Sequence, residues 1–259
     1  MTKIIERLIP FFTLIEREIA RNKRVLGQAI IAPLVTASLY IFIFGFIVGS
    51  RISDIEGVKY ISFVFPGIFT MNLILAVFSA TSFSIYFLKF QKTLEDFLTY
   101  PVSYVELVLS LIVSGLFRGI CIMIALTIVG VAFGVNEFAH PFLLFFYVLL
   151  VSFLFGLVGI VAGIWADNSF EKFGIVTNFV ITPLSFLGGA FYSVSMLPEN
   201  LRFLVHFNPL FYATDGIRYS LTGYSDSPIW FGLLVLFSLS ALFMFLTVRI
   251  FKTGWKLRS

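Results

Sequence analysis

Long apolar runs separated by short polar breaks divide this sequence. Each run is long enough to cross the hydrocarbon core of a bilayer, which takes about 20 residues of α-helix. Runs of this length and apolarity are typical of transmembrane helices. The pattern therefore predicts an all-α integral membrane protein with six transmembrane helices, at about residues 25–48, 60–88, 105–133, 142–165, 173–193 and 228–251.

The N-terminal segment differs from the runs that follow it. Residues 4–20 are apolar but carry interspersed charges, so they are too polar to span a membrane. A segment of this kind is typical of a helix that lies in the membrane interface. We expect a cytoplasmic interfacial helix over residues 1–24 and one transmembrane domain over residues 25–259.

The polar break between the second and third runs has helix signals of its own. Thr93 can cap a short helix together with Asp96 three positions on, and Pro101 ends it. Ser103 and Glu106 then form the pattern of a capping box at the start of the third run. We therefore predict a helix of about seven residues between these two spans.

This loop helix has two interpretations. It is either a solvated connector or a docking element for a cytoplasmic partner. A docking element needs both apolar and polar contacts on its surface. In that case the apolar contacts are Leu94, Phe97 and Tyr100, and the polar contacts are Glu95 and Asp96.

The stretch from Ile181 to Gly223 is a broken apolar region. The pair Gly188-Gly189 interrupts it, and two short amphipathic pieces begin at Pro198 and Pro209. As helices these pieces would rise about 15 Å and 21 Å, which is too short to span a bilayer. They predict either two helices that rest on the outer membrane surface or a re-entrant hairpin that covers a transport path.

Arg118 is the one Lys or Arg placed deep in a predicted span. It lies about 13 residues into the third run, or roughly 20 Å along a helix. A charge at this depth is costly and usually faces a bundle interior or a cavity. Arg118 is either a structural arginine that snorkels or bonds backbone carbonyls, or part of a transport path. Gly115 and Gly119 on the same helix would let a neighbouring helix approach closely.

Composition agrees with a lipid environment. Of the 259 residues, 59% are hydrophobic and 12% are charged, and the mean hydropathy is +1.01. A soluble domain of this length could not bury so much apolar surface. Of the 18 Lys and Arg, 13 fall in the breaks on the side of the two termini and 4 in the other breaks. Because cytoplasmic loops carry the excess of basic residues, both termini are predicted to be cytoplasmic, and the charge of +4 does not indicate nucleic-acid binding.

Motifs for catalysis and metal binding are missing from the sequence. It has no phosphate-binding G-x-x-x-x-G-K-[ST] loop, no H-E-x-x-H and no G-x-S-x-G. His140 and His206 have no partner at metal-ligand spacing, and the single cysteine can form no intrachain disulfide. Asp215 and Arg218, three positions apart, predict a local ion pair. We expect no catalytic residue, metal or cofactor on this chain.

Short motifs in a fixed order resemble the ABC-2 type permease family, and within it the inner-membrane permeases related to the nodulation-factor and daunorubicin exporters. The resemblance covers essentially the whole chain, and the order and spacing of the motifs are specific although each motif alone is weak. The motifs before the middle of the chain are Phe44-Gly45, Gly49-Ser50-Arg51-Ile52, Lys89-Phe90-Gln91 with Glu95 and Pro101, and Arg118-Gly119. The later motifs are Thr182-Pro183-Leu184, Leu187-Gly188-Gly189, Phe191-Tyr192-Ser193, Leu197-Pro198, Asn208-Pro209, Arg218-Tyr219 and Leu257-Arg258-Ser259.

The resemblance implies a multi-pass half-transporter of the bacterial inner membrane that forms a homodimer and binds two copies of a separate cytoplasmic ATPase, which holds ATP and Mg²⁺. It implies that the interfacial helix and a coupling helix at about 93–101 contact this ATPase, and that an external re-entrant hairpin lies at about 197–223. Carried over by position, the ATPase-coupling residues are Thr93, Leu94, Glu95, Asp96, Phe97, Tyr100 and Pro101. The transport path is Arg118, Pro183, Gly188, Gly189 and Tyr192, and the hairpin is marked by Pro198, Asn208, Pro209 and Arg218.

The predicted function is therefore a membrane permease that exports an amphiphilic or hydrophobic substrate with energy from a partner ATPase. The alternative is a secondary transporter or channel that needs no ATPase. It predicts carboxylates inside the spans for ion coupling, and none is convincingly central in the sequence. A membrane-embedded enzyme would need His, Asp or Glu clustered at one depth, and the sequence has no such cluster.

Overall fold

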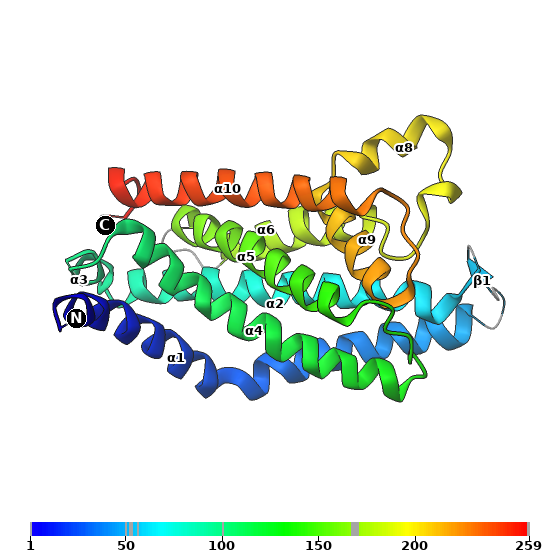
Figure 1. Cartoon of the computed structure of the whole chain (residues 1–259), viewed down its shortest axis with the longest axis horizontal. Helices are drawn as coiled ribbons and strands as arrows, with labels where there is room; N and C mark the ends of the chain where they lie inside the picture. Colours follow the sequence, from blue (N-terminus) through cyan, green and yellow to red (C-terminus); the bar gives the residue numbers. More distant parts are fainter. Residues whose placement is uncertain are drawn as a thin grey trace.

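The computed structural model of this chain describes residues 2–49, 51, 54–55, 57–99, 101–166 and 171–257, and for residues 2–8, 96 and 97 it describes the backbone alone. The described residues include five long helices, which run along the longest dimension of the structure (Figure 1). Each is long and apolar enough to cross a membrane, so five of the six predicted spans are confirmed as helices of that length. These helices are α1 (Thr2–Tyr40) with its π-helical continuation η1 (Ile41–Val48), α2 (Tyr60–Phe90), α4 (Tyr104–Ala132), α5 (Pro141–Ala166) and α10 (Ile229–Thr253).

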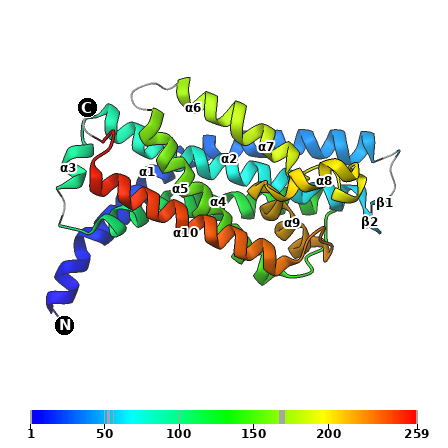
Figure 2. The ribbon, with the colours of Figure 1, turned by 90° about the horizontal axis from the view of Figure 1, so that it is seen from above.

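The segment predicted as the fifth span differs from the other five. It consists of three consecutive helical pieces, α6 (Glu171–Val176), the π-helical η2 (Thr177–Ile181) and α7 (Thr182–Leu187). The helical part ends earlier than the predicted residue 193, because Gly189 has a left-handed φ of 71° through which an α-helix does not continue. The pieces run along one edge of the bundle (Figure 2). That they form a sixth transmembrane span stays a prediction.

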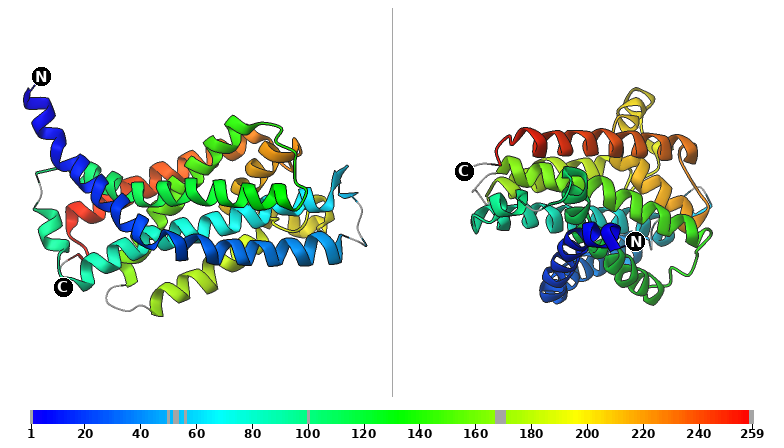
Figure 3. Two further views of the ribbon diagram at one scale, coloured as in Figure 1. Left: turned by 90° about the horizontal axis from the view of Figure 1, so that it is seen from below. Right: turned by 60° about the vertical axis from the view of Figure 1, so that its left-hand side comes forward.

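Helix α2 lies at the centre of the bundle. Of its most apolar stretch 89% is buried, compared with 11% for α1 and 17% for α10. Helix α2 packs against α4, α5 and α9 (Pro209–Thr222), whereas α1 and α10 lie on opposite outer faces (Figure 1, Figure 3). A helix that is apolar on every side suits either a protein core or lipid. The apolar pattern therefore gave no means to separate α2 from the outer helices.

Helix α1 continues without a break through residue 24, where the interfacial helix was expected to end. It contains Pro10 and Pro33, each of which lacks the N–H that would close a helical turn, and it bends partway along its length (Figure 1). Glu18 and Asn22 in its N-terminal part are buried, and α1 packs against α2 and α4. One face of this part belongs to the bundle, and its placement in the membrane interface stays a prediction.

The broken stretch contains the two short helices that Pro198 and Pro209 predict. A turn of 3-10 helix, η3 (Val194–Met196), leads to α8 (Glu199–His206), which starts directly after Pro198. Helix α9 starts at Pro209, where the Asn208 side chain accepts a hydrogen bond from the backbone N–H of Leu210 at 3.0 Å. Helix α9 is buried against α2, α5 and α10, whereas α8 lies outside the bundle (Figure 1). A re-entrant position of the pair in a membrane stays a prediction.

The two ends of the bundle carry different connections. Both termini lie at one end together with α3 (Leu94–Leu98), and α8 lies at the other end (Figure 1). The α3 helix has 5 residues, so the short loop helix is confirmed but is shorter than predicted. At the far end a two-stranded antiparallel hairpin of β1 (Asp54–Ile55) and β2 (Val58–Lys59) lies between η1 and α2, and the sequence pattern did not predict it.

The capping box predicted at the start of α4 is confirmed. Ser103 Oγ accepts a hydrogen bond from the backbone N–H of Glu106 at 3.3 Å, and the Glu106 carboxylate accepts from the backbone N–H of Ser103 at 2.6 Å. These bonds satisfy two of the backbone groups that a helix start leaves unpaired. The box fixes where the loop ends and α4 begins.

Candidate functional site

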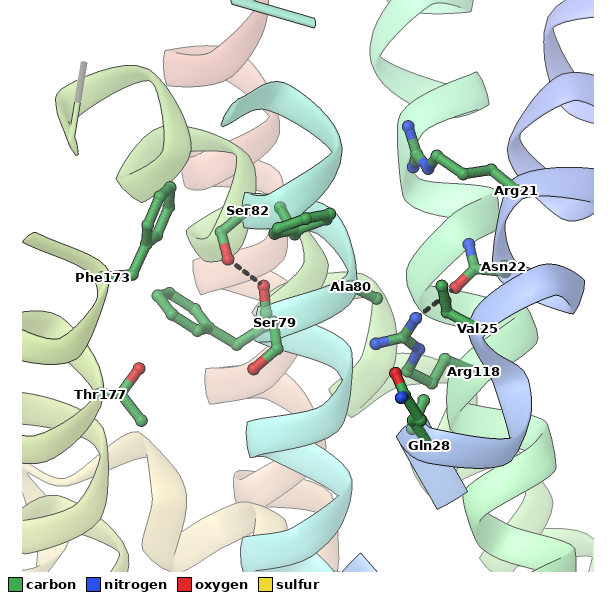
Figure 4. A pocket seen from close by; sticks show the side chains of 13 residues that line it. Arg21, Asn22, Val25, Gln28, Ser79, Ala80, Ser82, Arg118, Phe173 and Thr177 are labelled. Atoms are coloured by element: carbon green, nitrogen blue, oxygen red, sulfur yellow. Dashed lines mark hydrogen bonds between the residues drawn. The ribbon is translucent and has the colours of Figure 1, made fainter. Parts of the chain in front are cut away.

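Arg118, the charge predicted deep in a span, points from α4 towards α1. Its Nη2 donates a hydrogen bond to Oδ1 of Asn22 at 2.7 Å (Figure 4). The partner is therefore a side chain and not the backbone carbonyl that a structural arginine was expected to bind. The predicted close approach beside Arg118 is confirmed at Gly119, where an added Cβ would lie 2.2 Å from Oγ of Ser152 on α5.

Asn22 connects α1 to α4, and Glu18 connects α1 to α2. Asn22 Nδ2 donates to Ser114 Oγ at 2.6 Å and to the Glu18 carbonyl oxygen at 3.2 Å. Glu18 Oε2 accepts from Ser84 Oγ at 2.9 Å and pairs with Arg21. Glu18 is 0% exposed and Asn22 is 2% exposed. Because buried polar groups need hydrogen-bond partners, these contacts fix α1 against the other two helices.

This network has unused hydrogen-bonding atoms and excess positive charge. Within the described part of the chain, Glu18 Oε1, Arg21 Nη1 and Arg118 Nε are buried and have no hydrogen-bond partner. A buried polar atom left without a partner costs about 1–3 kcal/mol, and more when it is charged. The one carboxylate of the network, Glu18, pairs with Arg21, whereas Arg118 is bonded to the neutral side chain of Asn22. The site is therefore suited to an additional group with negative charge.

A cavity of about 400 Å³ lies beside the network, between α1, α2, α4 and the α6–η2 segment. Side chains of α1 and α4 line one side, and Phe173 and Thr177 line the other (Figure 4). Cavities of this size hold small ligands or parts of larger ones. The polar lining residues are Arg21, Asn22, Gln28, Ser79, Ser82, Arg118 and Thr177, and the apolar ones are Val25, Ala29, Phe78, Ala80, Phe83 and Phe173.

Three residues of this site were not expected from the sequence. Glu18, Arg21 and Asn22 fell in the segment assigned to an interfacial helix. Their spacing of three and four positions places them on one helix face, and this was the available signal. The sequence did not indicate which helix this face would meet, because 96 positions separate Asn22 from Arg118.

The other predicted transport-path residues lie elsewhere. Pro183 is in the first turn of α7, and Gly188 follows its last residue. The Gly189 carbonyl accepts a hydrogen bond from Arg218 Nη2, and the Tyr192 hydroxyl donates to a backbone carbonyl of α7 at 2.8 Å. None of these four predicted residues lines the cavity described above. Pro183 lies at the start of α7 and the other three lie in the turn that follows α7, so the structure does not join these residues to the arginine site.

The prediction of a direct ion pair between Asp215 and Arg218 is wrong for the described residues, although the two charges still attract each other. Arg218 pairs with Asp226 Oδ2 at 3.3 Å, and its Nε donates to the carbonyl oxygen of Phe63 at 3.3 Å. Asp215 accepts the backbone N–H groups of Asp226 and Ser227, at 2.7 Å and 3.0 Å. Burial lowers the pKa of Arg218 and raises the pKa of Asp215 relative to their usual ranges. Each group finds its partner in the loop before α10, because that loop folds back over α9.

One predicted contact of the loop helix is also wrong. Leu94 was expected on a docking surface, but it is 2% exposed and belongs to the same apolar cluster as Leu88 of α2 and Leu107 of α4. Its apolar side chain is removed from water by packing at the end of the bundle. Leu94 is therefore part of the core of this chain.

Three of the remaining coupling residues have described side chains. Thr93 donates its hydroxyl to the Leu88 carbonyl at 3.4 Å, and Glu95 and Pro101 are exposed. The side chains of Asp96 and Phe97 and the whole of Tyr100 lie outside the described residues. A coupling role for this loop stays a prediction.

Comparison with known proteins covers the region that contains the cavity. The model of the family described as ABC-2 type transporter matches residues 10–222. The inner membrane transport permease YadH of Escherichia coli (strain K12) is 34% identical over 223 residues, which cover 85% of this chain and 87% of that protein. Proteins named nodulation protein J from Rhizobium meliloti (strain 1021) and Rhizobium leguminosarum bv. viciae are 24% and 27% identical to this chain. Each match covers 78% of this chain, and the two matches cover 77% and 78% of those proteins. Every residue that lines the cavity falls inside the family match.

Proposed function

Because the chain belongs to the ABC-2 type transporter family, we propose that it is the membrane-spanning permease subunit of an ATP-driven exporter. Its substrate is amphiphilic or hydrophobic, and ATP and Mg²⁺ bind to a separate ATPase subunit and not to this chain. The observation that carries the proposal is the cavity of about 400 Å³ among helices of membrane-crossing length. Its lining of charged and aromatic side chains suits a molecule with a polar and an apolar part.

The position of α3 supports a coupling role for residues 93–101. Helix α3 lies between α2 and α4 in the chain, and both of these helices line the cavity. Its buried Leu94 shares an apolar cluster with the adjoining ends of both helices. Because packed protein interiors are hardly compressible, a push on α3 displaces the ends of α2 and α4. Closure of the ATPase on ATP would change the shape of the cavity by this route.

The assembly that we propose contains two copies of this chain and two ATPase subunits in a bacterial inner membrane. Helix α1 exposes a row of apolar side chains, including Ile31, Val35 and Leu39, that lipid or a second copy covers. Both termini and α3 lie on the cytoplasmic side, where the ATPase binds. Helix α8 and the β1–β2 hairpin then face the outside.

The test of the proposal is co-purification of the ATPase with variants of the coupling loop, at the exposed Glu95 and at Phe97, a predicted apolar contact. Glu95→Lys combined with Phe97→Ser should reduce ATPase recovery roughly tenfold, because a protein interface loses most of its affinity when a central contact is removed. Leu94 is left intact, since its replacement would disturb the fold. Glu137→Lys, an exposed charge reversal in the loop between α4 and α5, is the matched control and should keep full recovery. Undiminished recovery and ATP turnover in the double variant would contradict the coupling assignment.

One observation favours the alternative without an ATPase. Glu18 is a fully buried carboxylate on a helix of membrane-crossing length, and such groups carry protons in secondary transporters. Transport into vesicles that contain the purified chain alone, driven by a proton gradient and lost in Glu18→Gln but not in exposed Glu16→Gln, would establish this alternative. Transport that requires both ATP and the ATPase would exclude it.

A further inference from the structure

We propose that the cavity binds the anionic group of an acidic amphiphile, with Arg21 and Arg118 as the residues that bind it. The inference deepens the proposed function, on which it rests for the statement that this amphiphile is the exported substrate. Binding itself is a property of this chain and is testable without any ATPase.

The charge of the cavity lining is positive. Arg21 and Arg118 line it, and no Asp or Glu is among the described residues that do so. The nearby carboxylate of Glu18 is 0% exposed and is engaged through Oε2 by Arg21 and Ser84. The described lining has no carboxylate that could balance the charge of Arg118. A ligand with negative charge therefore supplies the counterion that the lining lacks.

Arg118 keeps a donor for such a ligand, and Arg21 adds a second positive charge to the lining. Arg118 uses Nη2 for its bond to Asn22, and its other terminal nitrogen points away from α1 into the cavity (Figure 4). Arg21 pairs with Glu18 and its Nη1 is buried, so Arg21 contributes its positive charge to the cavity wall. The planar guanidinium fork matches the geometry of phosphate and carboxylate oxygens, so two such groups favour a phosphate or carboxylate.

The rest of the lining suits an apolar tail. Phe78, Phe83 and Phe173 contribute aromatic surface to the cavity. Phe83 and Val25 remain 46% and 43% exposed, which places apolar side chains at the rim. Because the helices that form this rim are of membrane-crossing length, a tail that leaves the cavity past the rim enters lipid. The polar and apolar parts of the cavity thus bind the two parts of one amphiphile.

The same arrangement disfavours a zwitterionic headgroup. The quaternary ammonium of a choline headgroup would lie near two guanidinium groups, and like charges in a site of low dielectric repel strongly. A phosphate monoester carries negative charge without this cation. We therefore expect selection for an acidic amphiphile over a choline amphiphile with the same tails.

The experiment measures ligand binding to the purified full chain in dodecyl maltoside, by titration of its melting temperature. The probes are dihexanoyl phosphatidic acid, dihexanoyl phosphatidylcholine with the same tails, and glycerol 3-phosphate, which has the headgroup without tails. Phosphatidic acid should raise the melting temperature of the wild type, because a ligand that binds only the folded state stabilises it. The two other probes should bind at least about tenfold more weakly, since phosphatidylcholine adds a cation beside its phosphate and glycerol 3-phosphate has no tails.

Variants separate the arginines from general charge. Arg118→Gln and Arg21→Gln should each weaken binding of phosphatidic acid roughly tenfold or more, and Arg118→Lys should weaken it less because the charge remains. Arg249→Gln removes an exposed arginine outside the cavity and is the matched control, with binding equal to that of the wild type. If Arg118→Gln does not fold, Arg118→Lys and Arg21→Gln carry the test, since the Arg21 side chain is 22% exposed.

Three results would overturn the proposal: equal affinity for phosphatidic acid and phosphatidylcholine, equal affinity for phosphatidic acid and glycerol 3-phosphate, or unchanged binding in both Arg21→Gln and the Arg118 variants. None of these results depends on an ATPase. If the ATPase fails to associate with the chain while phosphatidic acid binds as expected, the proposed function fails and the anion site remains.

Discussion

The bond between Asn22 and Arg118 gives a quantitative test of the helix packing. Asn22→Ala removes the acceptor for Arg118 Nη2, in a guanidinium whose Nε already lacks a partner among the described residues. It also removes the donor to Ser114. A hydrogen bond to a charged group contributes about 1.5–3 kcal/mol, so we expect Asn22→Ala to lower the free energy of unfolding by about 2–3 kcal/mol.

The reverse change should cost less. In Arg118→Met, Asn22 Nδ2 keeps its bonds to Ser114 and to the Glu18 carbonyl, so only the neutral Oδ1 of Asn22 loses its hydrogen-bond donor and no buried charge is left unpaired. We expect a loss of about 1 kcal/mol. In the double variant the charge that Asn22→Ala would leave unpaired is absent. Hydrogen bonds between membrane helices give coupling energies of about 0.6 kcal/mol on average and up to about 1.7 kcal/mol, so we expect a coupling of about 1–2 kcal/mol for this charged pair.

The assay is reversible unfolding of the full chain in mixed micelles, followed by circular dichroism during titration with dodecyl sulfate. The four proteins of the double-mutant cycle are compared with Asn136→Ala, an exposed asparagine in the loop after α4. This control should change the free energy of unfolding by less than about 0.5 kcal/mol. If the two single changes add within about 0.5 kcal/mol, the side chains of Asn22 and Arg118 do not interact and the reasoning is refuted.

Two further predictions concern packing and topology. Gly119→Ala should lower the free energy of unfolding by about 1–3 kcal/mol through overpacking, because the new Cβ would lie 2.2 Å from Ser152 Oγ. Gly27→Ala is the control: no atom lies within 4 Å of its new Cβ, so it should be neutral or stabilising in the same unfolding assay. A cysteine at Lys92 should react with a membrane-impermeant reagent only from the cytoplasmic side, and one at Asn200 only from the outside. Labelling of both positions from the same side would contradict the six-span topology.

The positions of the long helices follow from the sequence alone. Crossing a membrane sets a minimum length of apolar residues, and this requirement acts within one segment. Five predicted spans are therefore helices of that length in the structure. Local signals were equally informative: the Ser103–Glu106 capping box and the start of α9 at Pro209 both depend on neighbouring residues.

The packing of these helices was not determined by the sequence pattern. Helix α2 is the central helix and α1 an outer one, although both are apolar over comparable lengths. In lipid, the hydrophobic effect does not distinguish a helix face that meets another helix from one that meets acyl chains. Burial of α9 but not α8 is likewise a result of tertiary contacts with α2, α5 and α10.

The partners of charged and buried side chains were decided only by tertiary structure. The sequence predicted Asp215 as the partner of Arg218, but a loop that folds back supplies Asp226 instead. The depth of Arg118 in an apolar run identified it as unusual, but the sequence could not indicate Asn22 as its partner. Asn22 reaches Arg118 only because α1 packs on α4. Partner choice depends on which helix faces meet in the folded bundle. Helix length and caps depend on adjacent residues, and for this reason the sequence alone determined them.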